Sequence, residues 1–213
     1  FFGLSNRVAD VFHAVNMVGL DTVRSLVLTA GVFEEFKGVN IPHSSVDEIY
    51  RTSVSVGTKS RLLAHTFGLD PLTVENAFLG GMLHDVGRLL MARCFREEYG
   101  RVMDLVTERS IPVYQAEEEV LGASDAVIGG FLLSLGPIGW LIIKAVALHY
   151  KPSNYANPVL GPLTAVHLGW AIDTDERMGL KFNESSSVDI DYLKALGMDS
   201  QGGIATRIEG GKL

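Results

Sequence analysis

Hydrophobic residues recur along most of the chain at spacings of three and four, which is typical of helices that bury one face. The two-residue alternation of exposed strands is not convincing in any segment. The clearest helical pattern covers residues 71–94 as one long helix, with apolar positions at Phe78, Met82, Leu83, Val86, Leu89 and Leu90. The pattern therefore predicts an all-α fold.

Helix-start signals support this interpretation. They are Asp21, Ser45 with Glu48 three residues later, and Asp70 followed by Pro71. Such residues cap the free N–H groups of a first turn, and proline is well tolerated at the first helical position. Further helices are expected over 97–109, 112–121, 125–135, 138–149, 159–173 and 189–196. The most polar stretch, 173–187, is predicted to be a loop.

The order of these elements indicates two helical units and a tail. We expect residues 1–38 to be the end of an N-terminal helical subdomain, 44–196 a helical bundle, and 197–213 a glycine-rich C-terminal tail. The apolar run 131–148 is interrupted by Gly136-Pro137 and contains Lys144. Because a membrane-spanning helix needs about 20 uninterrupted apolar residues, two short buried helices are predicted there instead.

Composition narrows the function classes. The chain has 213 residues, 47% of them hydrophobic, so it can form a sizeable core. Its net charge of -7 argues against a nucleic-acid partner, which would require a basic surface. Cys94 is the only cysteine, so it cannot form an intrachain disulfide, and we interpret it as a buried, inert thiol. With no recognisable signal peptide, the expectation is a cytoplasmic protein with no membrane partner. The chain begins without Met, as a processed or excised piece would.

The stretch 80–90, "GGMLHDVGRLL", places His84 beside Asp85 within an otherwise apolar helix. Imidazole and carboxylate groups together suit iron, manganese or zinc. Neighbouring helical residues point about 100° apart, so these two can share an ion only near a kink. Glycines at 80, 81 and 87 permit such a kink. Further ligand candidates from other helices are Asp125, His149 and His167.

Three segments in this order resemble the HDOD domain family, a degenerate relative of the HD and HD-GYP phosphohydrolases. They are "FLGGMLHDVGRLLM", "AEEEVLGASDAVIGGFLLSLG" and "AVALHYKP". The opening "FFGLSNRVADVFHAVNMVGLDTVRSLVL" is similar to the family's junction after its N-terminal helical half, and the resemblance covers about residues 1–175. It implies an all-α, HD-like helical bundle whose N-terminal helical half is largely missing from this chain.

The sequence departs from the catalytic HD pattern at four positions. Thr52, Asp125, Tyr150 and Trp170 stand where the resemblance leads us to expect metal ligands. The remaining candidates are His84, Asp85 and His149, with Asp125 as a substitute. A two-metal phosphodiesterase needs more ligands than these. We therefore expect no cofactor or, at most, one divalent ion (Fe, Mn or Zn) in a degenerate site, with no catalytic residue.

The resemblance implies a non-catalytic bacterial signal-transduction or regulatory module that binds a protein partner or a neighbouring signalling domain. Two alternatives stay open: a residual metal-dependent phosphohydrolase, and a nucleotide sensor that uses the degenerate active-site cavity. Other polar residues are given ordinary interpretations. We expect a surface salt bridge for Arg88, a core hydrogen bond for His167, a solvated helix face for Glu117 and Glu118, and surface or helix-end positions for His13, His43 and His65.

Overall fold

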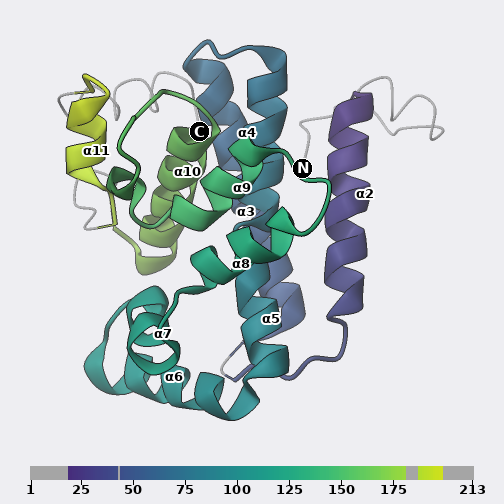
Figure 1. Cartoon of the computed structure of the whole chain (residues 1–213), viewed down its shortest axis with the longest axis vertical. Coiled ribbons are helices and arrows are strands. Elements are labelled where there is room, and N and C mark those ends of the chain that lie inside the picture. The colour runs from purple at the N-terminus through teal and green to yellow at the C-terminus, as the bar shows by residue number, and fades with distance from the viewer. Residues whose placement is uncertain (1–18, 43, 181–186, 199–213) are drawn as a thin grey trace.

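A computed structural model describes residues 19–42, 44–180 and 187–198 (Figure 1). Over these ranges the regular elements are helices, no strand forms, and the single β-type contact is an isolated bridge between Ile41 and Ser44. The all-α prediction is confirmed. The residues 1–18, where the N-terminal part of the first predicted unit falls, lie outside the described ranges, as does most of the tail 197–213.

The elements follow one another along the chain with short connections. They are α2 (Leu20–Glu35), α3 (Val46–Thr66), α4 (Pro71–Leu83), α5 (Val86–Cys94), α6 (Arg96–Arg109), α7 (Val113–Leu121), α8 (Asp125–Ser134), α9 (Trp140–Leu148), the 3-10 turn η1 (Pro152–Asn154), α10 (Pro162–Met178) and α11 (Ile190–Ala195).

The centre of the bundle is formed by α3, α4 and α10, which cross at glycines (Figure 1). A Cβ atom added to Gly81 of α4 would lie 2.6 Å from the Cα of Gly57 on α3. A Cβ added to Gly169 of α10 would lie 3.1 Å from the carbonyl oxygen of Val56. Because the helices approach this closely only without side chains, these glycines fix where α4 and α10 cross α3.

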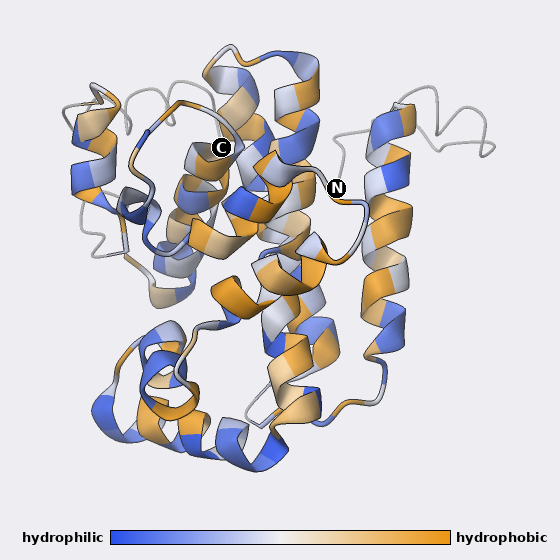
Figure 2. Cartoon of the chain, in the orientation of Figure 1, coloured by the Kyte–Doolittle hydropathy of each residue, from blue (hydrophilic) through white to orange (hydrophobic). Residues whose placement is uncertain are grey.

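Apolar side chains form separate clusters around this centre. One cluster lies between α3, α4, α10 and α11, and includes Leu63, Val166 and Tyr192. A second joins the ends of α2 and α3 to α5, α6 and α7, where Figure 2 shows hydrophobic residues between α6 and α7 and hydrophilic residues on their outer sides. A third, smaller cluster fills the space between α4, α5, α8 and α9.

Two of the three predicted caps are confirmed. Ser45 accepts a hydrogen bond from the N–H of Glu48 at 3.1 Å, and Asp70 accepts one from the N–H of Thr73 at 3.1 Å. The prediction for Asp21 is wrong, because α2 begins two residues earlier than predicted, with Gly19 as its N-cap. Gly19 has a φ of 91°, a conformation that favours glycine, and Asp21 lies in the first turn.

The predicted long helix 71–94 is two helices. α4 ends at Leu83, and α5 begins at Val86 after a turn formed by His84 and Asp85. Directly after this turn, the start of α5 packs against the start of α8. There, a Cβ atom on Gly87 would come within 1.9 Å of the carbonyl oxygen of Asp125.

Three further expectations have clear outcomes. The run 131–148 forms the end of α8, a connection at Gly136-Pro137, and α9, so the two short helices are confirmed. They are not buried as predicted, because Phe131, Leu135 and Trp140 are exposed. Across the described residues, no helix combines the length and apolar character required to cross a membrane. The predicted loop 173–187 is wrong over its first part, since α10 continues to Met178, and 181–186 lie outside the described residues. Cys94 is exposed rather than buried, because it is the last residue of α5 and its side chain lies beyond the packed face.

Candidate functional site

A cluster of buried polar side chains lies where α4, α5, α7, α8 and α9 meet. His84 and Asp85 form the turn between α4 and α5, and His149 follows the last residue of α9. One ligand atom from each of these residues lies within 4.8 Å of the other two. All three are at most 3% exposed. Segments far apart in the sequence thus bring two imidazoles and a carboxylate together, as predicted.

The two histidines are held by the same backbone device. His84 Nδ1 lies 2.7 Å from the carbonyl oxygen of Gly81, and His149 Nδ1 lies 2.8 Å from that of Val146. Because a carbonyl oxygen only accepts, both Nδ1 atoms donate, and Nε2 of a neutral ring so held carries a lone pair. Burial, followed by the His84 imidazole, lowers the pKa of His149 to about 3, so this ring is neutral at physiological pH.

Neither Nε2 atom has a hydrogen-bond partner among the described residues. His84 Nε2 lies 3.3 Å from Asp85 Oδ1, but the direction of this contact does not make it a hydrogen bond. Buried nitrogen lone pairs without a donor are uncommon in folded proteins. A metal-ligating histidine usually donates its other ring N–H to a carbonyl or carboxylate oxygen, which fixes its tautomer. Both histidines do so here through Nδ1.

Arg88, on the first turn of α5, neutralises Asp85 from the other side. Its Nη1 lies 3.5 Å from Asp85 Oδ2, and its Nε donates to the hydroxyl of Tyr99 at 3.2 Å. Burial alone would raise the pKa of Asp85, but the neighbouring His84 and Arg88 groups lower it below its usual value. The predicted surface salt bridge of Arg88 is wrong, because its side chain is only 16% exposed and faces this cluster.

Asp125 and Glu117 form a second carboxyl pair beside Asp85. The backbone N–H of Asp125 donates to Glu117 Oε2 at 2.8 Å, and both residues are fully buried. Burial, followed by the negative charge of Glu117, raises the pKa of Asp125 well above its usual value. Burial raises the pKa of Glu117 as well. Asp125, the fourth predicted ligand, is buried but lies outside the group of His84, Asp85 and His149 atoms that are within 4.8 Å of one another.

Aromatic rings cover the cluster at His149. The rings of His149 and Tyr150 have centroids 4.0 Å apart, and those of Tyr150 and Trp170 are 4.9 Å apart. Tyr114 of α7 stacks on Tyr150 at 4.5 Å. Tyr150 and Trp170 are two of the residues that replace expected metal ligands, so the substitutions both remove ligands and add a hydrophobic cover.

The remaining groups fit one divalent ion better than two. His84 and His149 offer Nε2 lone pairs, and Asp85 offers a carboxylate oxygen, a set that suits iron, manganese or zinc. When bound, such an ion would supply positive charge to the buried carboxylate. The ion would be held by the Nε2 atoms of His84 and His149, which lack a hydrogen-bond partner among the described residues, and by an oxygen of Asp85.

The other histidines have ordinary roles where they are described. His167 Nδ1 donates to the carbonyl oxygen of His149 at 2.7 Å, and its Nε2 accepts from the N–H of Asp189 at 2.9 Å. This confirms the predicted core hydrogen bond. His65 is exposed in the last turn of α3, as expected. His13 and His43 lie outside the described residues.

Two members of the buried cluster were not predicted. Glu117 is buried rather than solvated, although Glu118 and Glu119 next to it are exposed. The signal in the sequence was its place before the "VLGAS" segment of the family pattern, which left contact of Glu117 or Glu118 with the cavity open as an alternative. Tyr99 has no sequence signal, because a tyrosine at an apolar helix position predicts core packing alone.

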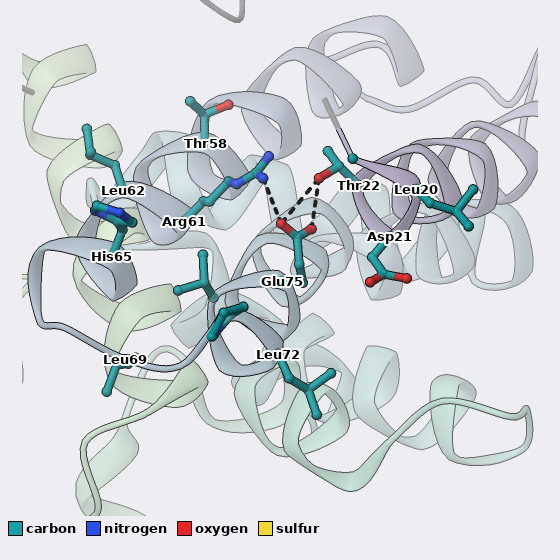
Figure 3. A pocket seen from close by; sticks show the side chains of 13 residues that line it. Leu20, Asp21, Thr22, Thr58, Arg61, Leu62, His65, Leu69, Leu72 and Glu75 are labelled. Carbon is teal, nitrogen blue, oxygen red and sulfur yellow. Dashed lines mark hydrogen bonds and ion pairs between the residues drawn. The ribbon is translucent and has the colours of Figure 1, made fainter. Parts of the chain in front are cut away.

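A cavity of about 990 Å³ lies at the other end of α4, away from the His–Asp cluster (Figure 3). Its walls are largely aliphatic, with Leu62 of α3 and Leu72 of α4 among them. Arg61 contacts Glu75 at 2.7 Å along one wall, and the Thr22 hydroxyl also donates to Glu75, at 3.1 Å. Thr22, Arg61 and Glu75 thus satisfy one another, and Asp21 and His65 also line the cavity.

Comparisons with known proteins agree with this geometry. A family profile described as the HDOD domain matches residues 1–152. An HDOD domain protein of unknown function from Geobacter sulfurreducens has a similar structure, with a TM-score of 0.73 and 24% identity, over 97% of this chain and 67% of that one. A proposed phosphohydrolase from Shewanella amazonensis SB2B has a TM-score of 0.74 and 20% identity, over 96% of this chain and 73% of that one.

An uncharacterized protein from Treponema pallidum (strain Nichols) is 23% identical over 151 residues, which are 70% of this chain and 28% of that protein. The chain thus spans little more than a quarter of this relative. Fold and site together define an all-helical protein with a buried His-Asp doublet. The chain belongs to the HDOD domain family.

Proposed function

We propose that this chain is a non-catalytic regulatory module of bacterial signal transduction, which acts by binding a protein partner or a neighbouring signalling domain. The observation that carries the proposal is that the cluster of His84, Asp85 and His149, where an HD phosphohydrolase would bind its metal, is closed to solvent. His84 and His149 are fully buried, and aromatic rings, among them Tyr150 and Trp170, cover His149. A phosphodiester must bring its phosphorus close to a metal-bound nucleophile, and a buried cluster under aromatic rings leaves it no path.

Exposed apolar side chains favour binding as the mode of action. On α8 and the start of α9, Val127, Phe131, Leu135, Trp140 and Leu141 are between 42% and 72% exposed. Figure 2 shows α8 as a largely hydrophobic segment. No charged residue occurs between Asp125 and Lys144, so this face lacks the charges that usually keep a surface in water. A protein partner with a complementary apolar surface fits it.

One divalent ion at His84, Asp85 and His149 is a second candidate property, compatible with the first. The observation that favours it is the pair of buried Nε2 atoms, which have no hydrogen-bond partner in the part of the chain that the structure describes. An ion held there would stabilise the junction of α4, α5 and α9 rather than catalyse hydrolysis, because a single ion lacks the second positive centre that holds both reacting oxygens.

The test is hydrolysis of bis(p-nitrophenyl) phosphate and of cyclic dinucleotides by purified protein, with and without added Mn²⁺, together with elemental analysis. We expect no turnover under either condition, whatever the metal content. Metal-dependent turnover that is lost in His84→Ala would contradict the proposal and favour the residual phosphohydrolase.

A further inference from the structure

His167 of α10 joins two segments of the backbone through both of its ring nitrogens. Its Nδ1 donates to the carbonyl oxygen of His149 at 2.7 Å, and its Nε2 accepts from the N–H of Asp189 at 2.9 Å. The His149 carbonyl lies at the end of α9, where carbonyl groups have no partner within their own helix. A fully buried imidazole thus connects a histidine of the cluster to the residue that precedes α11.

Asp189 holds the same segment a second time, at Ser153. Its Oδ2 accepts from the N–H of Ser153 at 2.9 Å, and its Oδ1 caps α11 by accepting from the N–H of Tyr192 at 3.1 Å. Ser153 belongs to η1, against which α11 packs. The residue at the start of α11 therefore holds both ends of the segment 149–153, one through His167 and the other directly.

The segment 149–153 carries part of the site and part of its cover. His149 belongs to the group of three residues whose ligand atoms lie within 4.8 Å of one another. The ring of Tyr150, next along the chain, lies 4.0 Å from the His149 ring between centroids and also contacts Tyr114 and Trp170. A displacement of this segment would therefore move a ligand-type imidazole and open its aromatic cover at the same time.

Helix α11 is short enough to separate from the rest of the bundle. It has six residues, and an isolated helix of fewer than about 12 residues is barely stable in water, so α11 is helical because it is docked. It docks through the buried side chains of Tyr192 and Leu193, and the Tyr192 hydroxyl lies 2.8 Å from Thr164 Oγ1. Figure 1 shows α11 at the edge of the molecule, beside α10. Such elements open locally at a lower free energy than the core.

We propose that α11 is a clamp on the buried cluster. While it is docked, it holds the segment 149–153 through Asp189 and His167, and its release exposes His149 to solvent. A partner that binds the apolar side of α11 would compete with the bundle for Tyr192 and Leu193, and would open the cluster. This inference rests on the proposed regulatory function, because regulation by binding requires two states that differ in their affinity for the partner.

The experiment compares wild type and Asp189→Ala as full chains, by hydrogen–deuterium exchange and by diethyl pyrocarbonate modification, both followed by mass spectrometry. Alanine removes both side-chain acceptors and keeps the backbone N–H that His167 accepts. We expect the amides of α11 and of 149–153 to exchange, and His149 to be modified, about tenfold faster than in wild type. The amides of α3 should exchange at the wild-type rate.

The matched control is Asp191→Ala, because Asp191 is exposed on the same helix and contacts Lys194 at 3.5 Å. It should protect His149 as wild type does. If Asp189→Ala does not fold, Asp189→Asn decides by the same measurements, because it keeps one acceptor oxygen.

Three results would overturn the proposal. The first is faster exchange in α11 while His149 stays protected, and the second is unchanged exchange in α11. The third is an equal increase of exchange in α3, because the whole bundle would then be destabilised. Hydrolysis by wild type instead tests the proposed function, because it is measured without any Asp189 variant.

Discussion

The imidazole rings of His84 and His149 meet edge to face, with centroids 5.2 Å apart and planes at 83°. Each ring donates its Nδ1–H to the backbone carbonyl three residues earlier, in Gly81 and Val146. The same local device at the ends of α4 and α9 thus presents two acceptor nitrogens at one point. The histidines of this HDOD chain are therefore ordered by the backbone, without the need for an ion.

This arrangement predicts how His84 variants behave. His84→Ala removes the donor to the Gly81 carbonyl and the imidazole beside Asp85 Oδ1, which should cost about 1–3 kcal/mol of unfolding free energy. His84→Gln keeps a donor and an acceptor, so it should be milder. Chemical denaturation of the three proteins measures the difference.

A chelator shows whether the stability lost in the His84 variants comes from hydrogen bonds alone or from a bound ion. If no ion is bound, EDTA leaves the melting temperature of wild type unchanged, and His84→Ala remains less stable than His84→Gln. If an ion contributes, EDTA lowers the melting temperature of wild type and has no effect on either variant, and both variants lose similar stability.

The contact of Gly87 with α8 predicts a severe effect of one methyl group. In Gly87→Ala the new Cβ would lie 1.9 Å from the Asp125 carbonyl oxygen and 2.8 Å from the Gly129 nitrogen, so α5 and α8 must separate. We expect a loss of at least about 3 kcal/mol. Gly100→Ala is the control, because a Cβ there meets nothing within 4 Å and α6 should gain about 0.5–1 kcal/mol. Similar denaturation midpoints for the two variants would refute this close packing.

Local patterns in the sequence were sufficient for most of the helices. The helical periodicity, Ser45, and Asp70 with Pro71 act within one turn, so they predict where α3 and α4 begin without knowledge of the rest of the fold. The break at Gly136-Pro137 predicts the separation of α8 and α9 in the same way.

Contacts between helices determine the features that the sequence pattern did not predict. The interruption between Leu83 and Val86 depends on how α5 meets α8, and apolar periodicity continues through it. The ligand group at His84, Asp85 and His149 was predictable only through the family resemblance, since its members come from separate helices. The roles of Glu117 and Tyr99 depend on which helix face is covered, and a run of glutamates or an isolated tyrosine does not determine that.

Asp189, the N-cap of α11, predicts an acid-sensitive contribution to stability. Burial would raise its pKa, but hydrogen bonds from Ser153 and from the N–H of Tyr192 lower it below the usual 3.8. The unfolded chain therefore binds this proton at higher pH than the folded chain. The stabilisation is complete above the usual pKa and is lost as the pH falls through the lower folded value.

Replacing Asp189 by Asn keeps an acceptor for the Tyr192 N–H but removes the charge, so it should lower stability at pH 7 and remove part of the acid-induced loss below pH 4. Unfolding free energies measured between pH 3 and pH 7 test both expectations. The nearby Asp191→Asn is the control at pH 7, because its exposed contact with Lys194 is worth little. A parallel pH dependence in Asp189→Asn and wild type would show that this carboxylate does not contribute.

The aromatic cover predicts how access to His149 is controlled. The rings of Trp170 and His149 are 5.7 Å apart, and Trp170 also contacts Tyr150. Trp170→Ala should therefore let diethyl pyrocarbonate reach an imidazole that is fully buried in wild type. We expect modification of the His149 peptide, followed by mass spectrometry, to become about tenfold faster, as a fall of about 1.4 kcal/mol in the opening free energy would give.

His65 is exposed and serves as an internal standard that should react equally in both proteins. The matched control is Trp140→Ala, because Trp140 is 64% exposed at the start of α9 and its removal should leave His149 protected. Equal protection of His149 in Trp170→Ala and wild type, with the variant folded by circular dichroism, would mean that the tryptophan does not close the site.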